Sequence, residues 1–126
     1  MNDAIDYPVV IRDMDLIRDV LLAIEKDRKL DGTGNYSWTL LGISDKSADD
    51  VMYSVRVLIQ ARYVTGSLTL PTISSLTWDG HEFLDNIKDP GIWAKTKKKA
   101  GELQGAGISV ISQIALAEVK KHFGLA

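Results

Sequence analysis

The chain offers few of the side chains that usually carry out catalysis or hold metal ions. It contains no cysteine, which excludes disulfide frameworks, thiolate metal sites and cysteine nucleophiles. The two histidines, His81 and His122, lie far apart, and His81-Glu82 lacks the second histidine at helical spacing that a zinc-binding helix needs. We interpret both as surface or packing residues.

The acidic residues near the start of the chain do not require a catalytic role either. Asp13, Asp15 and Asp19 surround the start of an expected helix, where capping and the helix dipole explain them. No Gly-x-Ser-x-Gly nucleophile motif is present. The sequence therefore predicts a protein that is not an enzyme, with no catalytic residue, no metal ligand and no cofactor.

Recognition of DNA is the other chemistry that the residue types permit. Tyr53, Arg56 and Gln60 share the outward side of an expected helix over residues 48 to 61. Arginine and glutamine carry the hydrogen-bonding groups that read guanine and adenine edges in the major groove. These three are the candidate DNA-contacting residues of that helix.

The local charge works against DNA recognition by this helix. Asp45, Asp49 and Asp50 surround its N-terminal end with only Lys46 among them, and that end is where recognition helices meet phosphates. From Tyr63 to Ile87 the chain has no lysine or arginine with which a hairpin would grip a phosphate. The alternative is a fold that serves protein contacts without binding DNA.

Charge is divided unevenly along the chain, whose formal net charge is -2. Residues 1 to 50 hold six lysines and arginines against eleven acidic residues, and residues 51 to 126 hold nine against six. The densest basic group comprises Lys88, Lys95, Lys97, Lys98 and Lys99, interrupted among charged residues only by Asp89. We interpret this group as a solvated helix face, of which the lysines at 95, 97, 98 and 99 supply auxiliary phosphate contacts if the protein binds DNA.

Periodicity and turn residues predict the elements that must position these side chains. Apolar spacing favours helices that begin after Asp13, Ser47 and Thr77, each of which is a good N-cap. The remaining expectations are a short strand at 36–41, a β-hairpin formed by 63–70 and 73–78, and further helices over 92–103 and 109–123. The first three helices are expected over 14–29, 48–61 and from 78 until Asp89-Pro90-Gly91 ends the pattern.

The chain of 126 residues has the size of one ordinary domain. We expect a domain over residues 10–100, a glycine-containing link at 101–107 and a C-terminal helix within 108–126. That helix should bury Ile111, Ile114, Ala115 and Val119, either on its own domain or on a second chain, and a homodimer is expected. The link contains Gly101, Gly105 and Gly107, without the spacing of a phosphate-binding loop.

The order helix, short strand, helix, hairpin, helix is that of a winged helix-turn-helix, in which a two-stranded wing follows the recognition helix. Leu76-Thr77-Trp78-Asp79-Gly80 resembles the exit from the wing in many bacterial winged-helix regulators. The expected fold is therefore α+β and winged helix-turn-helix-like, with a two-stranded β-hairpin wing and additional C-terminal helices. Because that fold commonly binds duplex DNA, a transcriptional regulator is the first functional expectation and a protein-interaction module the alternative.

Three segments, 12–18, 51–63 and 76–85 with Trp93, resemble the bacterial domain-of-unknown-function family numbered twenty-five thirteen. The resemblance covers roughly residues 10 to 100 and implies phage or mobile-element contexts, but no activity, catalytic residue or ligand. The chain departs from the expected family pattern at Ser54, where a histidine is expected, and at Arg62, where a glycine is expected. If that glycine is left-handed, Arg62 must adopt the same backbone at a cost or the helix must end differently.

Two further expectations concern the tryptophans and the cellular location. Trp38, Trp78 and Trp93 lie in or next to expected junctions, where we predict that each closes the core. The sequence has no apolar run long enough for a membrane span and no basic region typical of a signal peptide. A cytoplasmic protein without a membrane partner is expected.

Overall fold

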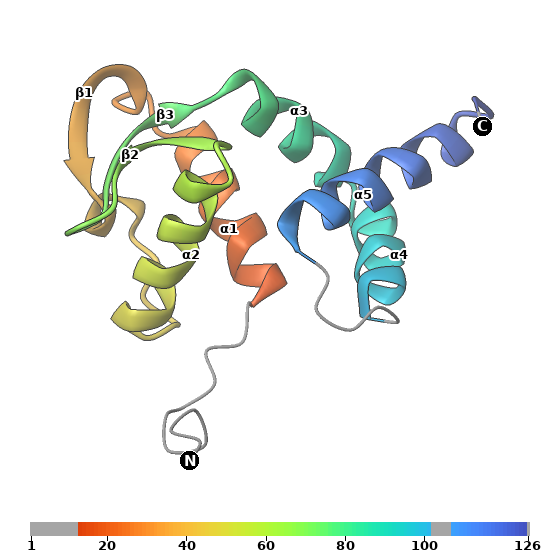
Figure 1. The fold of residues 1–126 in the computed structure, drawn as a ribbon, viewed down its shortest axis with the longest axis horizontal. Coiled ribbons are helices and arrows are strands. Elements are labelled where there is room, and N and C mark those ends of the chain that lie inside the picture. Colours follow the sequence, from red (N-terminus) through yellow and green to blue (C-terminus); the bar gives the residue numbers. More distant parts are fainter. Residues whose placement is uncertain (1–12, 102–106, 126) are drawn as a thin grey trace.

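The computed structural model describes residues 13–101 and 107–125, and these form an α+β fold of five α-helices and a three-stranded antiparallel sheet (Figure 1). Part of the predicted link, residues 102–106, lies outside the described residues, as do the ends of the predicted domain and helix at 10–12 and 126. In chain order the elements are α1 Met14–Lys26, β1 Asp31–Ser37, the 3₁₀ helix η2 Trp38–Leu41, α2 Ala48–Gln60, β2 Val64–Ser67, β3 Thr72–Leu76, α3 Trp78–Ile87, α4 Pro90–Gly101 and α5 Ile108–His122.

The first three helices begin where the sequence predicts, each with a side-chain cap. The backbone N–H of Leu16 donates to Asp13 Oδ1 at 3.0 Å, and that of Asp50 donates to Ser47 Oγ at 3.1 Å. Thr77 Oγ1 accepts from the N–H of Gly80 in the same way at 3.0 Å. α1 ends at Lys26, before the predicted position 29, because Asp27 is extended and its carboxylate accepts from the N–H of Lys29.

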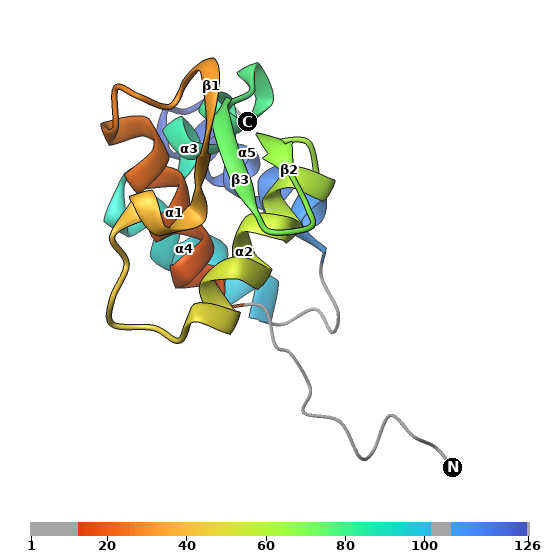
Figure 2. The ribbon, with the colours of Figure 1, turned by 90° about the vertical axis from the view of Figure 1, so that its left-hand side faces the viewer.

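The hairpin of β2 and β3 is confirmed, but the first strand lies earlier than predicted. β1 covers residues 31–37 and pairs with β3, which places β3 in the centre of the order β1-β3-β2 (Figure 2). The predicted strand at 36–41 is wrong beyond residue 37, where Ser37 Oγ accepts from Thr39 and caps a 3₁₀ turn. Gly42, with φ of 68°, ends that turn in a left-handed conformation.

The core joins one face of each helix to the inner side of the hairpin. The apolar stripe of α1 is buried against Val51, Val55 and Leu58 of α2 and Ile73 of β3. From α3, Phe83, Leu84 and Ile87 complete this cluster. Arg18 of α1 binds the end of α3, because its Nε donates to the carbonyl of Ile87 at 2.9 Å.

The C-terminal helix α5 docks on its own chain against α3 and α4. Ile111 and Ala115 are buried as predicted, and Ile108 joins them, whereas Ile114 and Val119 are only partly buried. Glu118, for which the sequence predicts no particular role, is also buried. Within the described ranges, no helix combines the length and apolar character that a membrane crossing requires.

Two of the three tryptophans pack inward. Trp93 is buried and donates its indole N–H to Asp15 at 2.8 Å, and Trp38 packs partly buried against the core. The core prediction for Trp78 is wrong, because 78% of this residue is exposed. Trp78 is the first residue of α3, whose inner face is taken by Gly80 and Phe83.

Candidate functional site

The N-terminal end of α2 is acidic in three dimensions as well as in sequence. Asp45, Asp49 and Asp50 are all exposed there. Lys46, the cation among them, binds Asp13 of α1 through an Nζ to Oδ2 contact of 3.0 Å. This contact raises the pKa of Lys46, and the pKa of Asp13 is lowered first by the N–H of Leu16 and then by Lys46. Negative charge therefore outweighs positive charge at this end of α2.

Arg56, the main candidate for reading bases, binds the hairpin. Its Nε donates to the carbonyl of Leu68 at 2.9 Å and its Nη2 to that of Thr69 at 3.1 Å. Tyr53 is half-buried on the same helix, and Gln60 is exposed at its end. The guanidinium thus ties the tip of the hairpin to α2.

The hairpin itself is tightly built and carries no positive charge. A Cβ on Gly66 would overlap the carbonyl of Thr72 on the neighbouring strand, so β2 requires glycine there. Thr65 Oγ1 accepts from the N–H of Ser75 at 3.1 Å and adds a side-chain link between the strands. At the tip, Leu68 and Leu70 are exposed, Leu70 to 75%. The tip therefore offers apolar side chains rather than cations.

The junction between α2 and the hairpin decides between the two alternatives expected for Arg62. Its φ is 66°, the left-handed conformation that glycine adopts most easily. The N–H of Arg62 donates to the carbonyl of Ile59 and that of Tyr63 to the carbonyl of Leu58, both at 3.0 Å, which is the Schellman pattern of a helix end. Thr77 Oγ1 donates to the carbonyl of Arg62 at 2.8 Å and links this junction to α3.

The lysines of α4 form a second candidate surface together with the end of α5. Lys97 contacts Asp15 at 2.9 Å and lies 5.8 Å from the ring centroid of Trp93. Lys99 and Lys121 both approach the buried carboxylate of Glu118, at 3.3 and 3.8 Å. Lys95 and Lys98 are exposed on α4.

The electrostatics of these ion pairs shift two pKa values. Lys97, followed by the indole N–H of Trp93, lowers the pKa of Asp15. Contact with the like-charged Lys99 lowers the pKa of Lys121, because the two cations share a single carboxylate. Positive charge is thus concentrated beyond what Glu118 neutralises.

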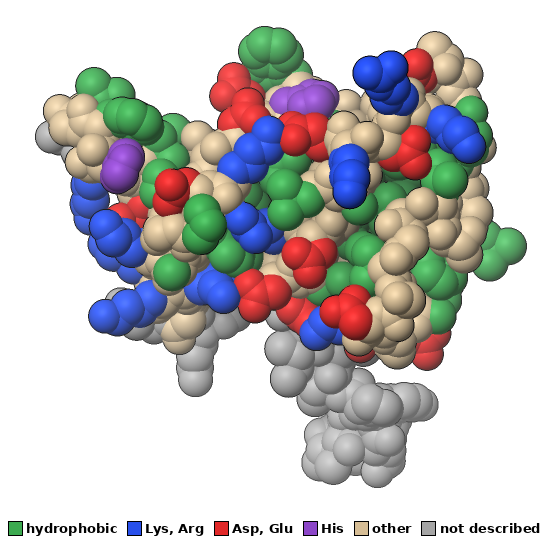
Figure 3. Space-filling view, turned by 180° about the vertical axis from the view of Figure 1, so that it is seen from behind, with side chains coloured by type: hydrophobic (Ala, Val, Ile, Leu, Met, Phe, Trp, Pro, Cys, Tyr) green, Lys and Arg blue, Asp and Glu red, His purple; other side chains and the backbone are tan. Residues whose placement is uncertain are grey.

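Charge is separated between the two ends of the described molecule. Residues 13–89 contain eight lysines and arginines against thirteen acidic residues, whereas residues 90–101 and 107–125 contain six lysines against Glu118 alone. Figure 3 shows the basic side chains gathered along the edge formed by α4 and α5. In Figure 1, α4 and α5 lie at the opposite end of the long axis from the hairpin. The structure therefore does not unite the predicted residues of α2 with the predicted lysines of α4.

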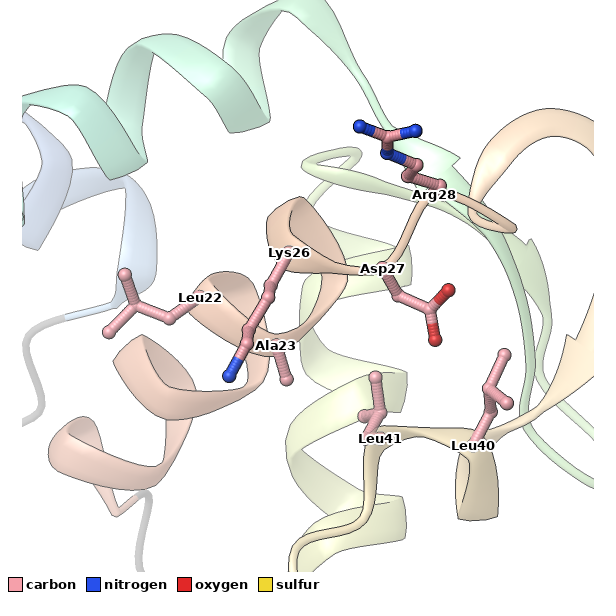
Figure 4. A pocket seen from close by; sticks show the side chains of 7 residues that line it. All are labelled: Leu22, Ala23, Lys26, Asp27, Arg28, Leu40 and Leu41. Carbon is pink, nitrogen blue, oxygen red and sulfur yellow. The ribbon is translucent and has the colours of Figure 1, made fainter.

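A hollow of about 530 Å³ lies between the end of α1 and η2 (Figure 4). Leu22, Leu40 and Leu41 line it together with Lys26 and Asp27. The hollow is open to solvent and shows neither a nucleophile with a neighbouring base nor a group of metal ligands. Across residues 13–101 and 107–125, no three histidine, aspartate or glutamate side chains gather closely enough to hold a metal ion. We assign no chemistry to this hollow.

Comparison with known proteins extends these observations. No curated protein and no solved structure matches the chain significantly. A family model does match, over residues 11–107, which is most of the chain and ends just before α5. The chain therefore belongs to the family described as "Hypothetical protein (DUF2513)".

Proposed function

We propose that this chain is a non-enzymatic, winged-helix-like protein that works as a protein-interaction module. Two features support the winged-helix assignment: the order α1, β1, η2, α2, β2, β3 and the strand order β1-β3-β2. In that fold the first strand pairs with the third, and the helix before the hairpin is the recognition helix. α2 and the β2–β3 hairpin then correspond to the recognition helix and the wing.

The hydrogen bonds that Arg56 makes within its own chain carry the proposal. A base-reading arginine must present its guanidinium to the DNA, but Arg56 donates to Leu68 and Thr69 of the hairpin tip. These bonds hold the wing in a set position against α2. The surface so formed combines negative charge at the start of α2 with the exposed leucines of the tip, and it suits a protein partner with basic and apolar side chains.

DNA binding is the second candidate, and the lysines of α4 and α5 favour it. Six lysines with one acidic residue on this end of the described chain form a local positive patch despite the negative net charge. Contacts through this patch would be to phosphates, so binding would show little sequence preference. In this arrangement Lys95, Lys97, Lys98 and Lys99 take the main role, while Tyr53, Arg56 and Gln60 lie away from the duplex.

A salt titration of binding to random duplex DNA separates the two functions. The interaction module predicts no detectable binding at about 50 mM salt, where roughly 3 phosphate contacts would still be visible. Detectable binding that falls with salt and is lost when the lysines at 95, 97, 98 and 99 become alanine would establish the second candidate instead. If Arg56→Ala weakens binding to one specific sequence by about 1 to 3 kcal/mol, the result would instead support base recognition through α2.

The interaction function has its own positive test. A protein retained from a lysate of the source cells by the wild type should be lost with Leu70→Asp and with the double variant Asp49→Lys, Asp50→Lys. Lys95→Glu, on the opposite end of the molecule, is the matched control and should retain the same protein. Equal retention by all the variants would contradict a partner surface formed by α2 and the hairpin.

A further inference from the structure

One side of α5 remains apolar and exposed after the helix has docked. The docking side carries Ile108, Ile111, Ala115 and Glu118, which are all buried. About a quarter turn away at 100° per residue lies a stripe formed by Leu116, Val119 and Phe123. Leu116 is 43% exposed, Phe123 is 67% exposed, and Val119 is half-buried. We call these three residues the α5 stripe.

The α5 stripe continues into a hollow between α3 and α5. This hollow has a volume of about 310 Å³, and its lining includes Trp78, Phe83 and Leu116. Trp78 is the most exposed tryptophan of the chain's described part. Asp79 and Glu82 add two carboxylates to the lining. The lining therefore combines aromatic and apolar side chains with these two carboxylates, which we call the acidic edge.

The C-terminal end of α5 is basic and aromatic, which complements the acidic hollow. Phe123 follows directly after Lys120, Lys121 and His122, so an exposed aromatic ring is accompanied by positive charge. Lys121 is engaged with Glu118, but no ion pair within the described residues involves Lys120. No ion pair of that kind involves Asp79 or Glu82 either. A basic and aromatic helix end thus matches an acidic and aromatic hollow.

We infer that a second copy of this chain binds here, with the two α5 helices antiparallel. If the two-fold axis passes between positions 119 and 120, Leu116 of one copy faces Phe123 of the other, and the two Val119 side chains meet near the axis. This contact is self-complementary, as a two-fold interface requires. Phe123 of each copy enters the hollow beside Trp78 of the other, and Lys120 approaches Asp79 and Glu82.

The length of α5 favours Phe123 of a second copy, rather than Phe123 of the same chain, as the occupant of the hollow. Leu116 and Phe123 are seven residues apart on α5 and the segment after it, or about 10 Å at 1.5 Å per residue, so Phe123 does not fill the hollow beside its own Leu116. Figure 1 shows the C-terminal half of α5 projecting beyond α4, where another chain has access to it. The contact uses α5 and the start of α3 and includes neither the start of α2 nor the tip of the hairpin, so it does not rest on the proposed function.

Sedimentation of the full chain over a range of concentrations tests the inference. The wild type should reach twice the mass of one chain, whereas Leu116→Asp and Phe123→Asp should each weaken the dimer about tenfold or more. Leu70→Asp places the same charge on a leucine of the hairpin tip that is more exposed than Leu116, and it should leave the dimer unchanged. A wild type that stays monomeric, or a dimer that both α5 variants leave intact, would overturn the inference.

Cysteine cross-linking tests the antiparallel register, because the chain contains no cysteine of its own. Val119→Cys should form a disulfide-linked dimer under mild oxidation, since the two positions meet near the axis. Leu116→Cys alone should not form a disulfide-linked dimer, because the two 116 positions are separated by about 10 Å along the helices, beyond the reach of a disulfide. A mixture of Leu116→Cys and Phe123→Cys chains should cross-link, and efficient linkage of Leu116→Cys to itself would refute the register.

An exchange of charges distinguishes self-association from capture of a foreign basic segment. Lys120→Glu and Glu82→Lys should each weaken the dimer, and a chain that carries both changes should regain it because both partners change together. Circular dichroism should show that the variants keep the wild-type fold, since both side chains are exposed. A doubly exchanged chain that stays as weak as the single variants would contradict the pairing of Lys120 with the acidic edge.

Discussion

Replacement of Arg62 by glycine should stabilise the protein. Arg62 has a φ of 66°, and a left-handed backbone costs a residue with a side chain about 1 to 2 kcal/mol. Glycine removes that cost but adds about 0.4 to 1 kcal/mol of backbone entropy to the unfolded chain. The Arg62 side chain is exposed and takes part in none of the hydrogen bonds or ion pairs of the described residues, so little else is lost. At the middle of both ranges the net gain is about 0.8 kcal/mol.

The Schellman bonds around Arg62 use only backbone atoms, so the glycine variant retains them. Thermal or urea unfolding should show a midpoint about 2 to 5 °C higher, or an equivalent gain in free energy with an unchanged m-value. Arg62→Ala is the matched control, because it removes the same side chain and keeps the left-handed strain. A glycine variant that is no more stable than the alanine variant would refute the account of strain at this helix end.

Three further substitutions test how the hairpin and the α1–α4 contact are held. Gly66→Ala should destabilise the fold by at least about 2 kcal/mol in urea unfolding, because its Cβ would overlap the carbonyl of Thr72, whereas an unchanged stability would contradict the fit. Arg56→Ala should speed hydrogen exchange of the hairpin amides while those of α3 stay protected, because it removes two bonds to the tip. Since Lys97 and Trp93 lower the pKa of Asp15, its stabilising effect should be present above the ordinary value of 3.8 and be lost as pH falls through the lowered pKa. Asp15→Asn should therefore flatten the stability-against-pH curve in that acidic range, and an unchanged curve would contradict the contact.

Local patterns in the sequence were sufficient to place most of the helices and the hairpin. Caps act over three residues, so Asp13, Ser47 and Thr77 could be identified without knowledge of the fold. The buried stripe of α1 follows from helical periodicity alone. The first strand was misplaced because its pairing with β3 and the bond from Trp38 N–H to the carbonyl of Pro71 join segments far apart in the chain.

The sequence predicted the charges of the candidate site but not the hydrogen bonds that its side chains make. The division of charge and the absence of cations from the hairpin are properties of the sequence, and they persist in the structure. No sequence pattern reveals that Arg56 binds the carbonyls of Leu68 and Thr69, because backbone acceptors carry no sequence signature. The burial of Glu118 has a weak sequence signal, since Glu118 shares the apolar face of α5 with Ile111 and Ala115.

The sequence by itself determined the starts of the first three helices, the hairpin and the family resemblance, and it left two alternatives for the helix end at Arg62. Each of these depends on residues that are close along the chain, where the covalent geometry limits the alternatives. Only the tertiary structure decided that Trp78 is exposed, that Arg56 is engaged with the hairpin, and that the lysines of α4 lie away from α2. These outcomes depend on how α3, α4 and α5 pack against the rest of the chain, because a side chain becomes exposed, bonded or distant only when other elements take their places around it.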